Sequence, residues 1–208
     1  MPALPPEREA AVPTLWLIAG PNGAGKTTYA RRYLRSVAGT SALVNVDEIG
    51  RGLAPLDPTP DPATSAAAAR IALARIAAAL TGPNSFAIET TLAGRTHLRT
   101  LDRAGAAGFG TVLLFATVPT AELCLARIAA RVAGGGHAVP EADVRRRFER
   151  SAANFAAYAA RAGRWLILDT QFAEPRPVAS ADAGRVSVHD PALLAQAPPA
   201  LRRAITDP

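Results

Sequence analysis

Residues 20–27 read GPNGAGKT and fit the spacing G-x-x-x-x-G-K-[ST] at every fixed position. The apolar run Leu15–Ala19 (LWLIA) predicts a strand directly before this segment, and Gly25–Val37 predicts a helix directly after it. Glycines let the backbone wrap around an anion, and the amides of the wrapped segment and of the helix start then point at it. The segment therefore predicts a phosphate-binding loop between a strand and a helix.

The chemistry of this loop predicts a nucleoside triphosphate, ATP or GTP, together with Mg²⁺. We expect the Lys26 ammonium to reach the β- and γ-phosphates and the Thr27 hydroxyl to bind the metal. The chain has 23 basic residues, and Lys26 is its single lysine. A compact ammonium therefore stands where the loop needs one, while arginine fills every other cationic position. The predicted cofactor-binding residues are Gly20, Asn22, Gly23, Ala24, Gly25, Lys26, Thr27, Thr28 and, beyond the loop, Arg131.

Apolar runs alternate with longer helical stretches along the chain, which predicts an α/β P-loop kinase fold with a central parallel sheet of about five strands and a helical lid. The predicted strands after the first are Ala42–Val46, Ser85–Glu89, Thr111–Ala116 and Trp165–Asp169. The predicted helices after the first are Ala63–Leu80, Arg95–Ala107, Thr120–Val132 and Glu141–Arg161, and the Pro-rich stretch Pro55–Pro62 is expected to be a loop.

We divide the chain into a flexible N-terminal segment (1–13), a kinase domain (14–174) with a lid at about 131–150, and a C-terminal tail (175–208) that packs on the same domain. The tail is expected to contain a hairpin around Gly184 and a last helix near Ala200–Ile205. With 208 residues, 49% of them hydrophobic, the chain suits one domain.

Composition and charge indicate the cellular location of the protein and the kind of ligand it binds. A single cysteine, Cys124, excludes an intramolecular disulfide, and its helical context predicts a buried, inert thiol. The start lacks the features of a signal peptide, and no apolar run is long enough to cross a membrane, so a cytoplasmic protein is expected. The net charge of +6 is compatible with nucleic-acid binding or with a basic cleft for a phosphate-rich substrate. Because the arginines are spread along the chain, we favour the cleft.

Three acids follow predicted strands, and ligands in such sheets bind beyond the carboxyl ends of the strands. Asp47 is either the general base that takes the proton of an acceptor hydroxyl or a metal ligand through water, with a turn-capping role as the simpler reading. Glu89, followed by Thr90 and Thr91, is a candidate to bind the acceptor or the outer shell of Mg²⁺, or to cap the next helix. Asp169 is equally compatible with a structural role and with a loop that flanks the adenine.

Residues 131–155 have the features of a mobile lid. Three consecutive glycines precede His137, and Pro140 begins a helix on which Arg146, Arg147, Arg150 and Asn154 recur at three- and four-residue spacings. Such a segment can close arginines onto phosphates and expel water, although a solvated basic face and a solvent-facing His137 are the simpler alternatives. The predicted catalytic residues are thus Lys26, Asp47, Arg146 and Arg150. The predicted substrate-binding residues are Asp47, Glu89, Thr90, Thr91, His137, Arg147 and Asn154.

The segments IAGPNGAGKTT, VDEI, AIETT and GGHAVPEADVRRRFERSAANF resemble the zeta-toxin family of P-loop kinases. The resemblance implies ATP or GTP with Mg²⁺ and phosphoryl transfer to a nucleotide sugar, best known as the 3′-hydroxyl of UDP-N-acetylglucosamine. It implies that Lys26 holds phosphate, that Asp47 is the base, that Glu89 and Thr90 contact the acceptor, and that lid arginines grip the γ-phosphate. It further implies a small antitoxin partner that blocks the nucleotide site.

Two other functions remain open. One is a small-metabolite kinase of the shikimate or gluconate type. The other is a nucleotide-driven switch that binds nucleic acid or protein, which would need an acid on the strand beside the phosphate-binding loop. From the sequence, Asp47 is the only candidate for that acid, because the fourth predicted strand ends without one.

Overall fold

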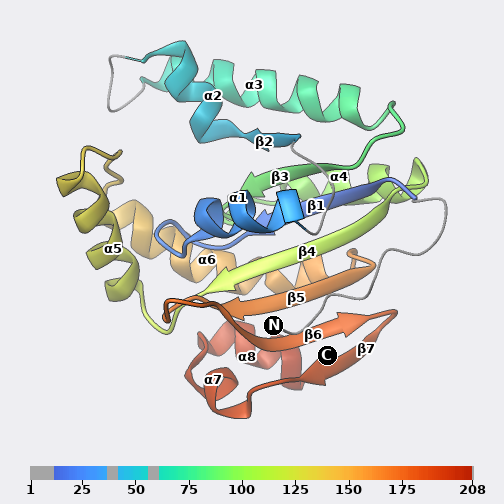
Figure 1. The fold of residues 1–208 in the computed structure, drawn as a ribbon, viewed down its shortest axis with the longest axis vertical. Helices are drawn as coiled ribbons and strands as arrows, with labels where there is room; N and C mark the ends of the chain where they lie inside the picture. Colours follow the sequence, from blue (N-terminus) through green and yellow to red (C-terminus); the bar gives the residue numbers. More distant parts are fainter. Residues whose placement is uncertain (1–11, 37–41, 56–60, 208) are drawn as a thin grey trace.

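The computed structural model describes residues 12–36, 42–55 and 61–207, and it shows helices on both faces of a central sheet (Figure 1). In chain order the elements are β1 (Thr14–Ala19), α1 (Lys26–Ser36), β2 (Leu43–Asn45), α2 (Val46–Leu53), α3 (Pro62–Ala79), β3 (Phe86–Thr90), α4 (Thr96–Ala106), β4 (Gly110–Thr117), α5 (Ala121–Ala133), α6 (Glu141–Ala159), β5 (Arg164–Asp169), β6 (Arg176–Asp182), β7 (Arg185–Val188), α7 (Pro191–Gln196) and α8 (Pro199–Thr206).

The sheet has seven strands in the order β2-β3-β1-β4-β5-β6-β7. The first five in this order pair in parallel, while β6 and β7 add antiparallel strands at one end. The predicted α/β fold is therefore confirmed, and the expected count of about five strands was too low by the two strands of the C-terminal hairpin. That hairpin turns at Gly184, which has a positive φ of 78° that favours glycine.

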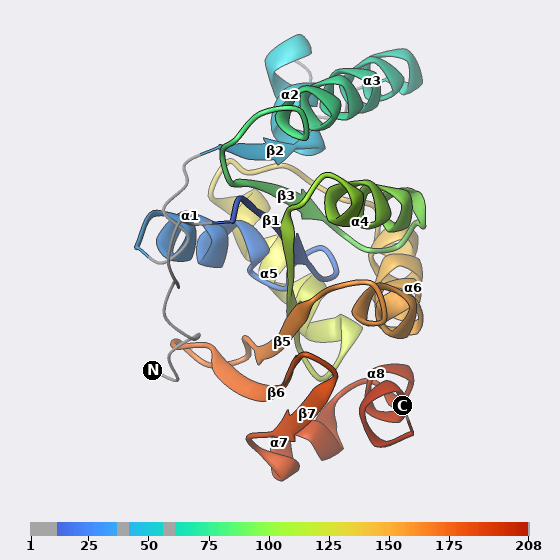
Figure 2. The ribbon, with the colours of Figure 1, turned by 90° about the vertical axis from the view of Figure 1, so that its right-hand side faces the viewer.

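The two faces of the sheet are covered unequally. Figure 2 shows α4, α6 and α8 on one side of the sheet and α1 on the other. The larger core lies under the first group, where Phe155 of α6 makes edge-to-face contacts with Phe115 and Trp165 at centroid distances of 5.2 and 5.4 Å. Under α1 a smaller core packs Ala30 and Leu34 against the strands. Leu166 and Leu168 of β5 belong to this smaller core, and together with Pro177 of β6 they also line a cavity.

The C-terminal elements belong to the larger core. Leu201 and Ile205 of α8 are buried among the residues of α6 and the sheet, and Leu193 and Leu194 of α7 join the same cluster. Helix α8 was expected from the sequence, whereas α7 was not, because six residues between two prolines carry little periodic signal.

Helix α2 is the main departure from the predicted secondary structure. The sequence predicted a strand through Val46 with Asp47 at its end, whereas β2 stops at Asn45 and Val46 begins a helix. The side chain of Asn45 caps this helix by accepting hydrogen bonds from the backbone of Asp47 and Glu48. Two of its eight residues are glycines, which lower the helix propensity, so the sequence did not predict this helix. The predicted segment 1–13, the end of the first helix at Val37 and the loop 55–62 lie largely outside the described residues.

Cys124 is buried on α5, as predicted, and burial raises the pKa of its thiol to about 11. A thiol with such a pKa is protonated at neutral pH and is a poor nucleophile. Among the helices in the described ranges, none combines the length and apolar character needed to cross a bilayer.

Replacing Phe155 by Ala should destabilise the protein by about 3–5 kcal/mol, because it removes the ring on which two aromatic contacts converge and leaves a cavity. The matched control is Phe172→Ala, since Phe172 is 38% exposed and its ring carries the Arg176 guanidinium at 3.9 Å. That change should cost about 1 kcal/mol. Urea unfolding followed by circular dichroism measures both values, and equal losses would contradict the assigned core.

Candidate active site

The phosphate-binding loop joins β1 to α1 and packs against two other elements. Gly20, Gly23 and Gly25 have positive φ values of 137°, 82° and 76°. A Cβ atom on Gly23 would lie 2.6 Å from the backbone oxygen of Cys124 in α5, and one on Gly20 would overlap the Ala116 carbonyl of β4. Glycine is therefore required at these two positions both by backbone conformation and by close approach. Gly25 meets only the first requirement.

Lys26 is buried at the start of α1, and its Nζ donates a hydrogen bond to the Pro21 carbonyl at 2.9 Å. Burial lowers the pKa of this ammonium, while the carboxylates of Glu89 and Asp47 partly offset the effect. The lysine is thus held inside the loop with two acids near it. A cation with little access to water is well suited to bind phosphate.

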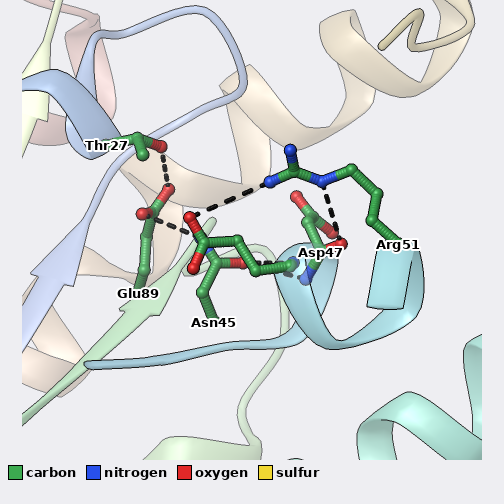
Figure 3. Close-up of polar contacts among 6 residues, drawn as sticks. Thr27, Asn45, Asp47, Arg51 and Glu89 are labelled. Carbon is green, nitrogen blue, oxygen red and sulfur yellow. Dashed lines mark hydrogen bonds and ion pairs between the residues drawn. The ribbon is translucent and has the colours of Figure 1, made fainter. Parts of the chain in front are cut away.

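Glu89 lies at the centre of a hydrogen-bonded network (Figure 3). Its Oε1 accepts from the Thr27 hydroxyl at 2.8 Å, and its Oε2 accepts from the Asn45 amide at 2.9 Å. Asp47 stands in the first turn of α2 next to this network. Burial raises the pKa of Glu89, and the Lys26 charge and the Thr27 hydrogen bond oppose that rise. The charges of both acids thus act on Lys26 from different elements, and all three residues line one cavity.

The strand order corrects one inference from the sequence. We expected Asp47 to be the only candidate for an acid on the strand beside the phosphate-binding loop. Strands β3 and β4 flank β1, so the acid on the flanking strand is Glu89, and β2 lies one strand further out. Asp47 follows β2 on a separate helix, away from the position that a Walker-B acid occupies.

A cavity of about 1100 Å³ opens above the carboxyl ends of the parallel strands. Its walls come from the phosphate-binding loop, α2 and α3 on one side, α5 and the lid loop on another, and the β5–β6 loop. Among the predicted site residues, those that line it are Asn22, Gly23, Gly25, Lys26, Thr27, Thr28, Asp47, Glu89, Arg131, His137 and Arg147. The structure thus brings together the loop, both acids and part of the lid.

Two arginines of the predicted lid segment line this cavity, one from α5 and one from α6. Arg131 at the end of α5 donates to the His137 carbonyl at 2.7 Å, which ties the glycine-containing loop back to the helix. Arg147 of α6 donates to the Asn22 side chain at 3.2 Å and so connects the lid to the phosphate-binding loop. Asp143 lies 3.5 Å from the Arg147 guanidinium and orients it.

The remaining predicted site residues lie outside the cavity wall. Arg146 is exposed and pairs with Asp143 at 2.7 Å, and Arg150 is exposed further along α6. The Thr90 and Thr91 hydroxyls accept from the backbone of Leu92 and Ala93. Gly20 and Ala24 shape the loop through their backbone. The ligand contacts expected of these residues stay predictions.

Asn154 and Asp169 have structural partners. Asn154 donates to the Leu92 carbonyl at 2.8 Å, which holds the loop after β3, where Leu92 has a positive φ of 59°. Asp169 is buried and accepts from the backbone and side chain of Gln171. These contacts favour a structural role for Asp169. The loop that follows it lines the cavity.

Sequence reasoning missed Arg127. Its guanidinium donates to the Thr170 carbonyl at 2.5 Å and lines the cavity one turn before Arg131. Thr170 in turn donates to the carbonyls of Ala24 and Thr117. Arg127 therefore connects α5 with the β5–β6 loop beside the phosphate-binding loop. The four-residue spacing from Arg131 was a signal that could have identified it.

Residues 15–150 match the model of a protein family described as the AAA domain. The chain belongs to this family. The match includes the phosphate-binding loop, and together with the sheet topology it shows a P-loop, kinase-like fold. A search of curated proteins found no match.

Solved structures share the fold at low sequence identity. The crystal structure of the AvrRxo1-ORF1:-ORF2 complex with ATP matches with a TM-score of 0.71 and 20% identity, over 90% of this chain and 64% of that one. The chain thus spans 64% of the length of that relative. The PezAT chromosomal toxin–antitoxin system of Streptococcus pneumoniae matches with a TM-score of 0.65 and 16% identity, over 97% of this chain and 82% of that one.

No group of three or more His, Cys, Asp or Glu side chains within the described ranges is arranged to hold a metal ion. The Thr27 hydroxyl and the Glu89 carboxylate offer the smaller set of hard oxygen donors that suits Mg²⁺ bound together with phosphates.

Because Lys26 is the only lysine, incorporation of ¹³C-labelled lysine during expression gives one set of lysine signals that NMR can follow. Its pKa should lie below the ordinary value of 10.5, because burial disfavours the ammonium. Adding ATP should raise this pKa, since the phosphates place negative charge beside the amine. The variant Lys26→Arg assigns the signal. A pKa at or above 10.5 without nucleotide, or no change with ATP, would contradict the buried phosphate-binding role.

Proposed function

We propose that this protein is a phosphotransferase that moves the γ-phosphate of ATP or GTP onto a hydroxyl of a small molecule. The observation that carries the proposal is that Glu89 and Asp47 line the same cavity as Lys26 and come from two different elements. One acid is hydrogen-bonded to the phosphate-binding loop, and the other is on the side formed by α2 and α3. A protein that only hydrolyses nucleotide needs the first acid, whereas transfer to an alcohol also uses an acid on the acceptor side.

The nucleotide's phosphates would lie on the amides of the phosphate-binding loop, at the start of α1 and beside Lys26. Thr27 and Glu89 would hold Mg²⁺, which when bound neutralises charge on the transferring phosphate. Arg127, Arg131 and Arg147 line the same cavity from α5 and α6. Their guanidinium groups would stabilise negative charge that develops during transfer.

Asp47 is the proposed general base. It lines the cavity on the side of α2 and α3, together with Arg51, Ser65 and Ala68. There its carboxylate would orient the acceptor hydroxyl and take its proton as the new bond to phosphorus forms. The part of the cavity between α2, α3 and the phosphate-binding loop is the proposed acceptor site.

The best candidate for the acceptor is the 3′-hydroxyl of UDP-N-acetylglucosamine. The resemblance of the P-loop, the AIETT segment and the lid sequence to zeta toxins supports it, and the fold likeness to a toxin–antitoxin system is compatible with it. An antitoxin protein that covers the nucleotide site is the corresponding partner. A small metabolite of another kind is the alternative acceptor within the same reaction class.

A nucleotide-dependent switch is a second candidate function, because Glu89 supplies an acid on the strand beside the phosphate-binding loop. Such a protein would hydrolyse ATP without any acceptor. Acceptor-independent hydrolysis that persists when Asp47 is replaced would favour the switch over the kinase.

The test is incubation of purified protein with Mg²⁺, ATP and UDP-N-acetylglucosamine, read by mass spectrometry as the gain of one phosphate. Asp47→Asn should lower transfer at least about 100-fold, since general-base catalysis contributes 10²–10⁴-fold, and should leave ATP affinity unchanged. The matched control is Asp102→Asn, because Asp102 is exposed and pairs with Arg161 away from the cavity.

Two results would change this assignment. If Asp47→Asn loses Mg²⁺-dependent ATP binding, Asp47 is a metal ligand and not the base. If the wild-type protein binds ATP but leaves the sugar nucleotide unmodified, the acceptor is a different hydroxyl compound, and a screen of phosphorylated metabolites is the next step.

A further inference from the structure

We infer that Asn45 is a positioning residue that fixes the proposed magnesium-binding carboxylate and the proposed base relative to each other. The inference rests on the proposed function, because it assigns those roles to Glu89 and Asp47. It adds that one buried amide, on neither the phosphate-binding loop nor the lid, determines whether both acids are in place.

Both ends of the Asn45 side chain are engaged. The residue is 6% exposed and is the last of β2. Its Oδ1 accepts from the backbone amides of Asp47 at 2.8 Å and Glu48 at 3.2 Å. Its Nδ2 donates to Glu89 Oε2 at 2.9 Å (Figure 3). The amide orientation is fixed by chemistry, because backbone amides only donate and an ionised carboxylate only accepts.

The consequence for Glu89 is that both carboxylate oxygens are fixed. Oε1 accepts from Thr27 and Oε2 accepts from Asn45, so the carboxylate cannot rotate without losing a hydrogen bond. Lys26 is close enough to attract the same carboxylate. Without the Asn45 donor, Glu89 would be free to turn towards that cation and away from the Thr27 side of the site.

Asn45 acts on Asp47 through helix α2. The two hydrogen bonds from Oδ1 set where α2 begins, and Asp47 is the second residue of that helix. The backbone of the proposed base is therefore anchored to the same side chain that holds Glu89. Arg51 adds a contact to the Asp47 carbonyl at 3.4 Å and an ion pair with Glu48 at 3.9 Å on the exposed side of the helix.

A residue that only caps a helix would have different requirements. Ser and Asp are both good caps, so either would replace Asn if capping α2 were its whole role. The Ser hydroxyl is a single atom and cannot occupy the positions of both Oδ1 and Nδ2, and an ionised Asp has no donor and would place a second carboxylate against Glu89. The pair of variants Asn45→Ser and Asn45→Asp therefore separates the helix cap from the hold on Glu89.

The experiment measures ATP affinity of the full chain by calorimetry with and without Mg²⁺ for the wild type, Asn45→Ser and Asn45→Asp. We expect the Ser variant to keep the wild-type melting temperature within a few degrees and the Asp variant to melt lower because its carboxylate repels Glu89. Both should lose about 10–100-fold in Mg²⁺-dependent affinity, the range typical of residues that orient a metal ligand. The affinity for ATP without Mg²⁺ should be unchanged. The matched control is Asp190→Ser, which exchanges the cap of the remote helix α7 and should alter neither affinity.

A second set of variants, measured in the same way, combines Asn45→Ser with Glu89→Ala. If Asn45 acts through Glu89, it should have no further effect on Mg²⁺-dependent affinity there. A further loss as large as in the wild-type background would overturn the inference. So would wild-type Mg²⁺ dependence in the Ser and Asp variants. A wild-type protein that shows no Mg²⁺-dependent ATP binding would instead overturn the proposed function, and this inference with it.

Discussion

The parallel pairing of β3 with β1 determines where the charges of this site lie. Glu89 is the cross-strand neighbour of Ile18, and Thr90 is that of Ala19, the last residue before the phosphate-binding loop. This register brings the Glu89 carboxylate within 2.8 Å of the Thr27 hydroxyl at the start of α1. A shift by one residue would turn the side chain to the other face of the sheet. The strand order thus converts an acid 62 residues away in sequence into a neighbour of the loop.

Burying these charges has a cost, and the local contacts offset it. Isolated in the interior, Lys26 and Glu89 would both favour their neutral forms, and the directions of their pKa shifts reflect this. Each is stabilised by the opposite charge of the other and by hydrogen bonds from or to Pro21, Thr27 and Asn45. A buried lysine paired in this way gains further when phosphate arrives, because the ligand adds negative charge on the side that faces the cavity.

The sequence was sufficient for features with local signals. The phosphate-binding loop, the five parallel strands and the Gly184 turn follow from fixed spacing, apolar runs and glycine conformation. It was insufficient for α2, where two glycines mask a short helix that Asn45 caps, and for the acid beside the loop, because strand order is a non-local property. Arg127 was missed for a related reason, since its partner Thr170 lies 43 residues away. The strand order and the contacts of Asn45, and not composition, support the roles proposed for Glu89 and Asp47.

The most direct test of this division of roles is a crystal structure of the protein with Mg²⁺ and a non-hydrolysable ATP analogue. The account predicts that the β- and γ-phosphates contact Lys26 and the loop amides, that the metal lies beside Thr27 on the Glu89 side, and that Asp47 remains free of the metal and faces the space between α2 and α3. A structure in which Asp47 ligates Mg²⁺ while Glu89 points elsewhere, or in which the triphosphate lies outside the loop, would contradict the central claim.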